Sequence, residues 1–455
     1  MTSIATRLAR IPERRAWALA LGALAGAFAL AFAAQKTILL ADYPDWVYQG
    51  VVAHARVFSP GEATRYALKN YPVPNSFVSA AVAGLLSIAP PLAASHLLLV
   101  AYLAAFAFVL SGAACAISPD DGHAKALFLF PAIALGMPFW WGSLNYQFAL
   151  LFFTAYLYCD ASRRLSPLRL AALSILVFFC HAIVFMVLVA HAGLKGFLAR
   201  RRVVVLALLP ALGLALWYVV GRYVVARNME QIHLTTDFAP TVANLLFYQL
   251  HMLLKLGPFH NLLTPDGRSF LAPFPALFWA LFGLHGLYLA LAAFAIAHRL
   301  PAQWRSAAFD GRYDTVFFLA LGAASLIVPL RLLGVADFGQ RMMILAFLGL
   351  CLRTPFTRAA SRAACAIALL AALPALVFLF RASANPPPPL PPAPANGASD
   401  ALMDRLLDAP IFARTAYYDS IRRRDFTRPI FPSGMLMDTR DSKSVAPAAA
   451  AAPTP

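Results

Sequence analysis

Charged residues are scarce in this sequence. Asp, Glu, Lys and Arg make up 13% of its 455 residues, whereas 61% are hydrophobic and the mean hydropathy is +0.69. Soluble globular domains carry roughly 25% charged and about 45–50% apolar residues. The scarcity of charge therefore argues against a water-soluble globule, a disordered chain and a secreted disulfide scaffold.

Cysteine is rare as well. The chain has five cysteines, all inside apolar stretches and none at a metal-ligand spacing. Cysteines in such places are typical of small buried hydrophobic residues. The sequence also has no glycine-rich nucleotide-binding loop and no carboxylate cluster. We therefore expect neither a metal ion nor another cofactor.

Long apolar runs fill most of the chain. A helix needs about 20 mostly apolar residues to cross the hydrocarbon core of a membrane. The pattern predicts an all-α polytopic membrane protein with about 10–12 transmembrane or re-entrant helices. For the first run, a membrane anchor is favoured over a cleaved signal peptide. The uncharged runs are 17–34, 70–119, 126–159, 170–194, 203–221, 269–297, 315–330, 342–352 and 363–380.

The basic residues are concentrated in short loops. Of the 37 Lys and Arg residues, 17 lie near the N-terminus or in four short segments between apolar runs. The positive-inside rule places these loops in the cytoplasm and the balanced outer loops 41–74 and 222–268 on the periplasmic side. The net charge of +17 thus indicates orientation in a bacterial inner membrane, with a cytoplasmic N-terminus, and no nucleic-acid partner. The four segments are 163–169, 195–202, 299–312 and 353–362.

Two parts of the chain strain this topology. Between the outer loop 41–74 and the basic segment 163–169 lie four apolar segments, and four crossings would return the chain to the wrong side. One of them must fail to cross, and the pattern leaves open whether it is 75–89 or 124–139. The run 170–194 is flanked by basic residues at both ends, which favours a hairpin of two short helices with its apex near His181.

The pattern divides the chain into three parts. Residues 1–380 form the transmembrane domain, whose periplasmic loops are expected to carry helices; the stretch 249–261 alternates polar and apolar residues as an interfacial helix does. Residues 381–399 form a proline-rich linker. Residues 400–455 form a small extracytoplasmic tail that we expect to be partly disordered.

Two carboxylates directly follow the first apolar run. Asp42 and Asp45 stand among Tyr43, Trp46 and Tyr48. A carboxylate at the membrane surface is suited to take a proton from a hydroxyl group. An interfacial aromatic belt with helix-capping aspartates explains the same residues, and the pattern leaves both interpretations open.

The order of features along the chain resembles a known family. An acidic residue after the first helix precedes Val47-Tyr48, a short helix, the pair Tyr71-Pro72, the stretch 140–148 (WWGSLNYQF) and the predicted hairpin. This order resembles the GT-C superfamily of integral-membrane glycosyltransferases over residues 15–200, and more loosely to 380. It is most similar to the bacterial polyprenyl-phosphate-mannose-dependent mannosyltransferases.

The resemblance implies a GT-C-like fold and an enzyme that transfers a sugar from a polyprenyl-phosphate donor to a lipid or glycan acceptor on the outer face of the membrane. In that family the acid after the first helix is the catalytic base. Asp45 matches the D-x-x-Y spacing, with Tyr48 in the tyrosine position, and Asp42 matches the alternative in which the acid immediately follows the helix. Direct displacement by the activated hydroxyl predicts inversion at the anomeric carbon.

Further candidates surround the expected reaction. Cations are needed for the departing phosphate, and polar side chains for the sugar or the acceptor. Snorkelling arginines, helix caps and histidines that are hydrogen-bonded inside the bundle are the alternative interpretations of the same residues. The phosphate-binding candidates are Arg331, Arg341 and His260, and the sugar- or acceptor-binding candidates are Tyr48, Asn145, Gln147 and His181.

Other functions stay open at this point. An O-antigen polymerase or ligase would also use outer-face arginines and lipid-linked glycans. A lipid or glycan transporter would show inverted repeats or charged residues in several helices at mid-membrane, where we find only histidines, His181 and His191. A non-catalytic assembly protein would use its proline-linked tail for docking. The expected partners of the leading candidate are membrane lipid, the polyprenyl-phosphate sugar and a lipid or polysaccharide acceptor.

Overall fold

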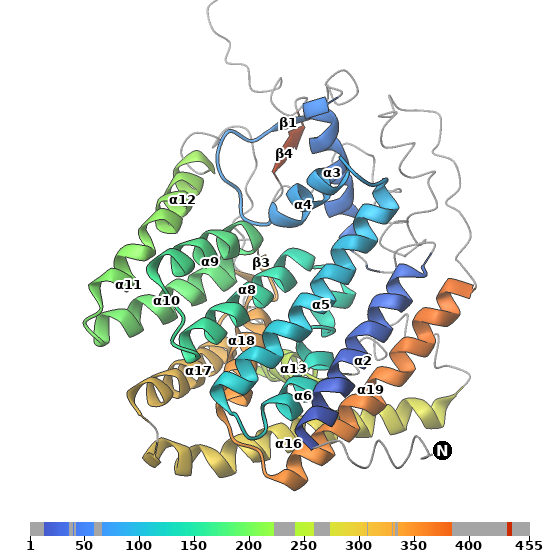
Figure 1. Ribbon diagram of the computed structural model, residues 1–455, viewed down its shortest axis with the longest axis vertical. Helices are drawn as coiled ribbons and strands as arrows, with labels where there is room; N and C mark the ends of the chain where they lie inside the picture. Colours follow the sequence, from blue (N-terminus) through green and yellow to red (C-terminus); the bar gives the residue numbers. More distant parts are fainter. Residues whose placement is uncertain are drawn as a thin grey trace, which may run out of the picture.

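The computed structural model is built almost entirely from helices (Figure 1). Two small ladders of two short antiparallel strands each are the sheet structure in the described part of the chain. The predicted all-α class is therefore confirmed. The structure describes residues 13–35, 40, 42–58, 66–222, 242–258, 274–306, 308–329, 331–332, 335–384 and 435–438.

The described chain begins with a long helix and continues through a series of mostly shorter ones. In chain order, its helices and strands are α2 (Glu13–Ala33), α3 (Tyr43–Phe58), β1 (Tyr66–Leu68), α4 (Phe77–Leu85), α5 (Pro91–Ile117), α6 (Gly122–Ile133), α7 (Met137–Trp140), α8 (Leu144–Ala161), α9 (Pro167–Cys180), α10 (Ala182–Leu198), α11 (Arg202–Ala207), α12 (Leu209–Val220), α13 (Val242–Leu254), α16 (Pro275–Ser306), α17 (Phe309–Ile327), β2 (Arg331–Leu332), β3 (Val335–Ala336), α18 (Phe338–Arg353), α19 (Arg358–Ala384) and β4 (Leu436–Asp438).

Four of the described helices are long and apolar enough to cross a membrane. They are α2, α5, the Pro275–Arg299 part of α16 and the Arg358–Arg381 part of α19. The 27 residues of α5 contain no charged side chain, and a helix of that length spans about 40 Å, more than the hydrocarbon core of about 30 Å. Shorter apolar helices include α9, α10 and α12, and α9 packs against the other two. These features are those of a membrane protein.

The basic segments gather at one end of the helix bundle, which we name the basic end. The start of α2, the loop between α5 and α6, the ends of α8 and α10, the start of α17 and the loop between α18 and α19 meet there. Five contacts join them: Arg362 Nε to Glu13 Oε1 at 2.9 Å, Phe356 N to Asp121 Oδ2 at 2.7 Å, Lys195 Nζ to Asp160 Oδ2 at 2.6 Å, Lys195 Nζ to Asp310 Oδ1 at 3.5 Å, and Arg353 to Asp314.

The opposite end of the bundle, which we name the Asp42 end, holds α3, α4, β1 and β4 (Figure 1). Backbone contacts place the Trp141 turn and the end of α9 there as well. The Asp42 amide donates to the Trp141 carbonyl at 2.8 Å, and the Ser76 amide donates to the Phe179 carbonyl at 3.0 Å. The two ends thus separate the segments predicted to face the cytoplasm from those predicted to face outward.

The segment 75–89 is the one that does not run from end to end. Its helix, α4, has nine residues and therefore rises only about 13 Å. Both of its flanks lie at the Asp42 end, because Ser76 contacts Phe179 there and α5 begins there. By contrast, α6 and α7 together lead from the basic end back to Trp141. Of the two segments that the sequence pattern left open, 75–89 is therefore the one that does not run from end to end.

The run 170–194 is a hairpin, as predicted. Helices α9 and α10 meet at His181, whose extended backbone (φ −162°, ψ 124°) interrupts the helical path. The His181 ring packs edge-on against Tyr146 at the start of α8, whereas Lys195 near the end of α10 reaches Asp160 at the end of α8. Helix α10 therefore runs parallel to α8, and the apex of the hairpin lies at the Asp42 end.

A short piece of the C-terminal tail also lies at the Asp42 end. Strand β4 pairs antiparallel with β1, and the Lys69 amide donates to the Met435 carbonyl at 2.9 Å. Helix α19 starts at the basic end, beside Glu13. The tail segment 435–438 is thus at the end opposite the basic loops. The predicted linker 381–399 and tail 400–455 lie mostly outside the described residues, and so does much of the loop 222–268.

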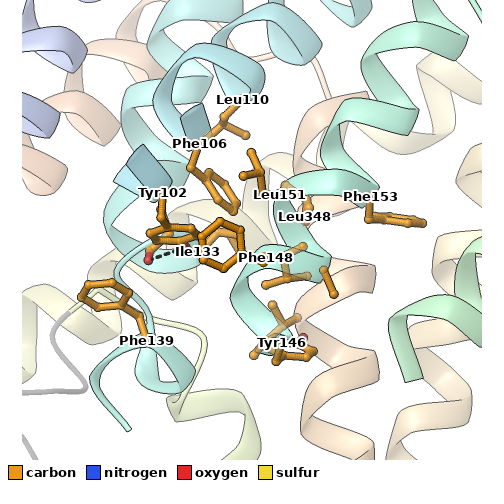
Figure 2. Packing of buried hydrophobic residues seen from close by; sticks show 14 of the residues in the cluster. Tyr102, Phe106, Leu110, Ile133, Phe139, Tyr146, Phe148, Leu151, Phe153 and Leu348 are labelled. Carbon is orange, nitrogen blue, oxygen red and sulfur yellow. Dashed lines mark hydrogen bonds between the residues drawn. The ribbon is translucent and has the colours of Figure 1, made fainter. Parts of the chain in front are cut away.

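An aromatic core separates the two ends. Tyr102 of α5 stacks on Phe139 with ring centroids 5.7 Å apart and meets Phe148 of α8 at 5.2 Å (Figure 2). The Tyr102 hydroxyl donates to the Ala134 carbonyl at 2.9 Å, so this buried polar group is satisfied. The start of α8, with Tyr146, is part of this core (Figure 2).

Candidate active site

The turn 140–145 packs directly on the backbone of Asp42. Gly142 has a positive φ of 74°, and a Cβ atom there would lie 2.4 Å from the Tyr43 nitrogen and 2.6 Å from the Asp42 nitrogen. Only glycine allows this approach, because any side chain would collide with backbone atoms. The two sequence motifs that carry the family resemblance are therefore in contact, although about a hundred residues separate them.

Arg341, in the first turn of α18, reaches two of the aromatic residues at the same end. Its guanidinium contacts His181 Nε2 and lies 5.6 Å from the centre of the Tyr146 ring. The Tyr146 hydroxyl donates to the Arg341 carbonyl at 2.9 Å, and the Tyr146 and His181 rings meet edge to face at 5.1 Å. These contacts hold the Arg341 guanidinium at the Asp42 end.

Asp42 lies within electrostatic range of that cation. Burial raises the pKa of the Asp42 carboxyl from 3.8 to about 6, and the positive charge of Arg341 acts in the opposite direction. At neutral pH the group is therefore mainly a carboxylate, yet it is a much stronger base than an ordinary aspartate. A pKa near the working pH is what an efficient general base requires.

Asp45 occupies a different environment. It lies in the first turn of α3, where the helix dipole favours a carboxylate, and its side chain is buried. Tyr48, one turn further along α3, is 4% exposed. Asp42, as described above, lies within electrostatic range of Arg341.

Asn145 and Gln147 are both buried and hydrogen-bonded within the fold. The Asn145 side chain accepts from the Val78 amide and donates to the Asn75 carbonyl, both at 2.9 Å, so it ties α8 to the start of α4. The Gln147 amide is hydrogen-bonded to the Tyr102 hydroxyl at 2.7 Å. These contacts tie the start of α8 to α4 and α5, and the sugar-binding role of both residues stays a prediction.

Arg331 and His260 are the two remaining phosphate-binding candidates. The backbone of Arg331 pairs with Ala336 in the ladder of β2 and β3, but its side chain is outside the described atoms. His260 lies outside the described residues altogether. Their roles stay predictions.

A second cation at this end was missed from the sequence. The Lys255 side chain, directly after α13, is 7% exposed; its Nζ lies 3.7 Å from Asp337 Oδ1 and 3.3 Å from Gln340 Oε1. The sequence pattern indicated only an interfacial helix over 249–261. The signal that could have found Lys255 is its place inside an apolar stretch, because a lysine there needs a buried partner.

The basic end holds a separate cluster around Asp314, whose side chain is fully buried. The His191 Nε2 atom lies 3.1 Å from Asp314 Oδ1, Lys195 Nζ lies 3.4 Å from it, and Arg353 contacts the other carboxylate oxygen. The Tyr156 hydroxyl is 2.7 Å from His191 Nδ1. This arrangement bears out the interpretation of His191 as a hydrogen-bonded histidine inside the bundle. The cluster joins α8, α10, α17 and α18.

Comparison with known proteins adds no assignment. No family model matches the chain, and neither a curated protein nor a solved structure is similar to it. The site therefore has to be interpreted from its own chemistry.

Proposed function

We propose that the chain is a glycosyltransferase that moves a sugar from a polyprenyl-phosphate donor to the hydroxyl of a lipid or glycan acceptor. The observation that carries the proposal is the Asp42 carboxylate, with its raised pKa, within electrostatic range of the Arg341 guanidinium, which contacts His181. A base and a cation held at one end of a membrane bundle are the two groups that this reaction needs.

The reaction assigns one role to each group. The Asp42 carboxylate takes the proton of the acceptor hydroxyl as its oxygen attacks the anomeric carbon. The bond between that carbon and the phosphate oxygen breaks, and the electron pair leaves with the lipid phosphate. Arg341 stabilises the negative charge that grows on this phosphate. Attack opposite the leaving group inverts the configuration at the anomeric carbon.

The arrangement of charges supports an extracytoplasmic site. The basic segments lie at the other end of the bundle, where the positive-inside rule expects the cytoplasm. The acceptor and the donor headgroup would therefore meet the enzyme on the outer face of the inner membrane. This placement rests on the charge rule, and a reporter fused after residue 380 tests it directly.

The proposal is tested by two matched variants, Asp42→Asn and Asp45→Asn. Membranes carrying each variant are assayed for transfer from a radiolabelled polyprenyl-phosphate sugar. We expect Asp42→Asn to lower the rate by about 10²–10⁴-fold, the usual contribution of a general base, and Asp45→Asn to retain most of it. Wild-type activity in Asp42→Asn would refute the assignment. A wild-type protein that transfers no sugar from such donors would favour the polymerase, ligase or transporter alternatives.

A further inference from the structure

We infer that the Asp337 carboxylate occupies the place of the donor phosphate in the free protein, and that the phosphate displaces it from Lys255. Lys255 thereby becomes a second phosphate-binding residue beside Arg341. The inference rests on the proposed function for the identity of the phosphate, but the binding of a phosphate group can be measured without it.

The position of Asp337 is unusual for its residue type. It is the N-cap of α18, where an aspartate normally accepts hydrogen bonds from the first amides of the helix. Its side chain makes no such bond, and its backbone has a left-handed conformation (φ 54°) that is uncommon for a residue other than glycine. The carboxylate instead faces Lys255 Nζ at 3.7 Å. Contact with the cation, not capping, therefore accounts for its orientation.

The two partners differ sharply in burial. The Lys255 side chain is 7% exposed, whereas that of Asp337 is 38% exposed. A buried ammonium is costly without an anion, so the charged form of Lys255 is stabilised by a partner anion. An exposed carboxylate can move away at little cost if another anion takes over. Gln340, which is 2% exposed and accepts from Lys255 Nζ, keeps the cation in place during such an exchange.

The geometry of α18 brings the second cation to the same place. Arg341 follows Asp337 by one helical turn, and its amide nitrogen lies 3.2 Å from the Asp337 carbonyl oxygen. The charges of Asp337 and Arg341 also attract each other. Asp337 therefore lies close to Lys255 and within electrostatic range of Arg341.

The charge change of the reaction explains the use of two cations. A sugar joined to a lipid phosphate carries one negative charge on a phosphodiester, whereas the released lipid phosphate is a monoester with a charge of about −1.5 to −2 at neutral pH. One cation balances the donor, and the second balances the charge that appears when the bond breaks. Lys255, once released from Asp337, supplies the second.

The test measures binding of farnesyl phosphate, a short isoprenyl monophosphate, to the purified full-length protein in detergent. Asp337→Asn removes the internal anion and should tighten binding about tenfold, and Lys255→Met should weaken it about tenfold. Asp310→Asn at the basic end, which also removes a carboxylate near a lysine, should leave it unchanged. Farnesol and inorganic phosphate serve as further probes that separate the lipid tail from a free phosphate.

Each outcome decides the inference. Weaker or unchanged binding in Asp337→Asn, unchanged binding in Lys255→Met, or equal effects on farnesol would overturn it. Tighter binding of inorganic phosphate alone, without an effect on farnesyl phosphate, would also overturn it. If Lys255→Met is not recovered as a monodisperse protein, Lys255→Arg, which keeps the charge, is compared with Lys255→Gln. Because no transfer is measured here, a wild-type protein that transfers no sugar from polyprenyl-phosphate donors would refute the glycosyltransferase proposal and leave this binding result standing.

Discussion

Replacing Asp314 by Asn should cost more stability than any other single change of charge at the basic end. The carboxylate is fully buried and meets His191, Lys195 and Arg353. Asparagine keeps the size of the side chain but leaves Lys195 and Arg353 facing a neutral amide. Removing one partner of a buried ion pair costs about 3–5 kcal/mol, a large part of a total stability of about 5–15 kcal/mol.

The matched control is Asp310→Asn. This carboxylate contacts the same lysine at 3.5 Å, but it is 56% exposed, and exposed pairs contribute only about 0–1 kcal/mol. The free energy of unfolding of both variants is measured by titration with SDS in mixed micelles, followed by circular dichroism. A loss below about 1 kcal/mol in Asp314→Asn, or equal losses in the two variants, would refute the reasoning that burial sets the value of this pair.

Three further predictions concern the Asp42 end. The transfer rate should fall as the pH drops through about 6, because the Asp42 carboxyl is protonated below its raised pKa. A pH profile of kcat/KM checks this, and a rate that is independent of pH between 5 and 8 would contradict it. Gly142→Ala should lower the stability of the fold by about 1–3 kcal/mol and remove most of the activity, because its Cβ would meet the Tyr43 and Asp42 nitrogens. Gly213→Ala, with open space around its Cβ, should change neither, and thermal unfolding and transfer assays compare the two variants. Asn145→Ala should destabilise the fold by about 2–4 kcal/mol through two lost buried hydrogen bonds, and an unchanged stability with a raised KM for the donor would instead favour a sugar-binding role.

Much of the architecture could be predicted from charge and hydropathy. The hairpin at His181 followed from basic residues on both sides of one apolar run, because a single crossing would have placed one group on the wrong side. The expectation that one segment does not run from one end of the bundle to the other followed from the same rule. The sequence could not tell which segment this is, because 75–89 and 124–139 are both apolar and each contains or adjoins proline. The packing of α4 at the Asp42 end identifies it as 75–89.

The site was harder to predict, because polar residues in apolar helices look alike whatever they bind. Asn145 was a candidate for a sugar ligand, yet its amide bonds the backbone of Asn75 and Val78. Lys255 and Asp337 were missed as a pair, since they come from distant parts of the chain and their contact depends on how α13 meets α18. Long-range pairing of this kind leaves no local pattern in a sequence.

The role of Asp42 as the base is tested most directly by the transfer rate of Asp42→Asn, measured together with its stability. Burial raises the pKa of Asp42 from 3.8 to about 6, so at pH 7.5 the charged form destabilises the fold by up to about 3 kcal/mol. This destabilisation is absent below about pH 4 and grows as the pH rises towards 6, because the fold favours the protonated carboxyl. We therefore expect Asp42→Asn to be at least as stable as the wild type at pH 7.5 and to transfer sugar about 10²–10⁴ times more slowly. A variant that is equally stable and fully active would contradict this role.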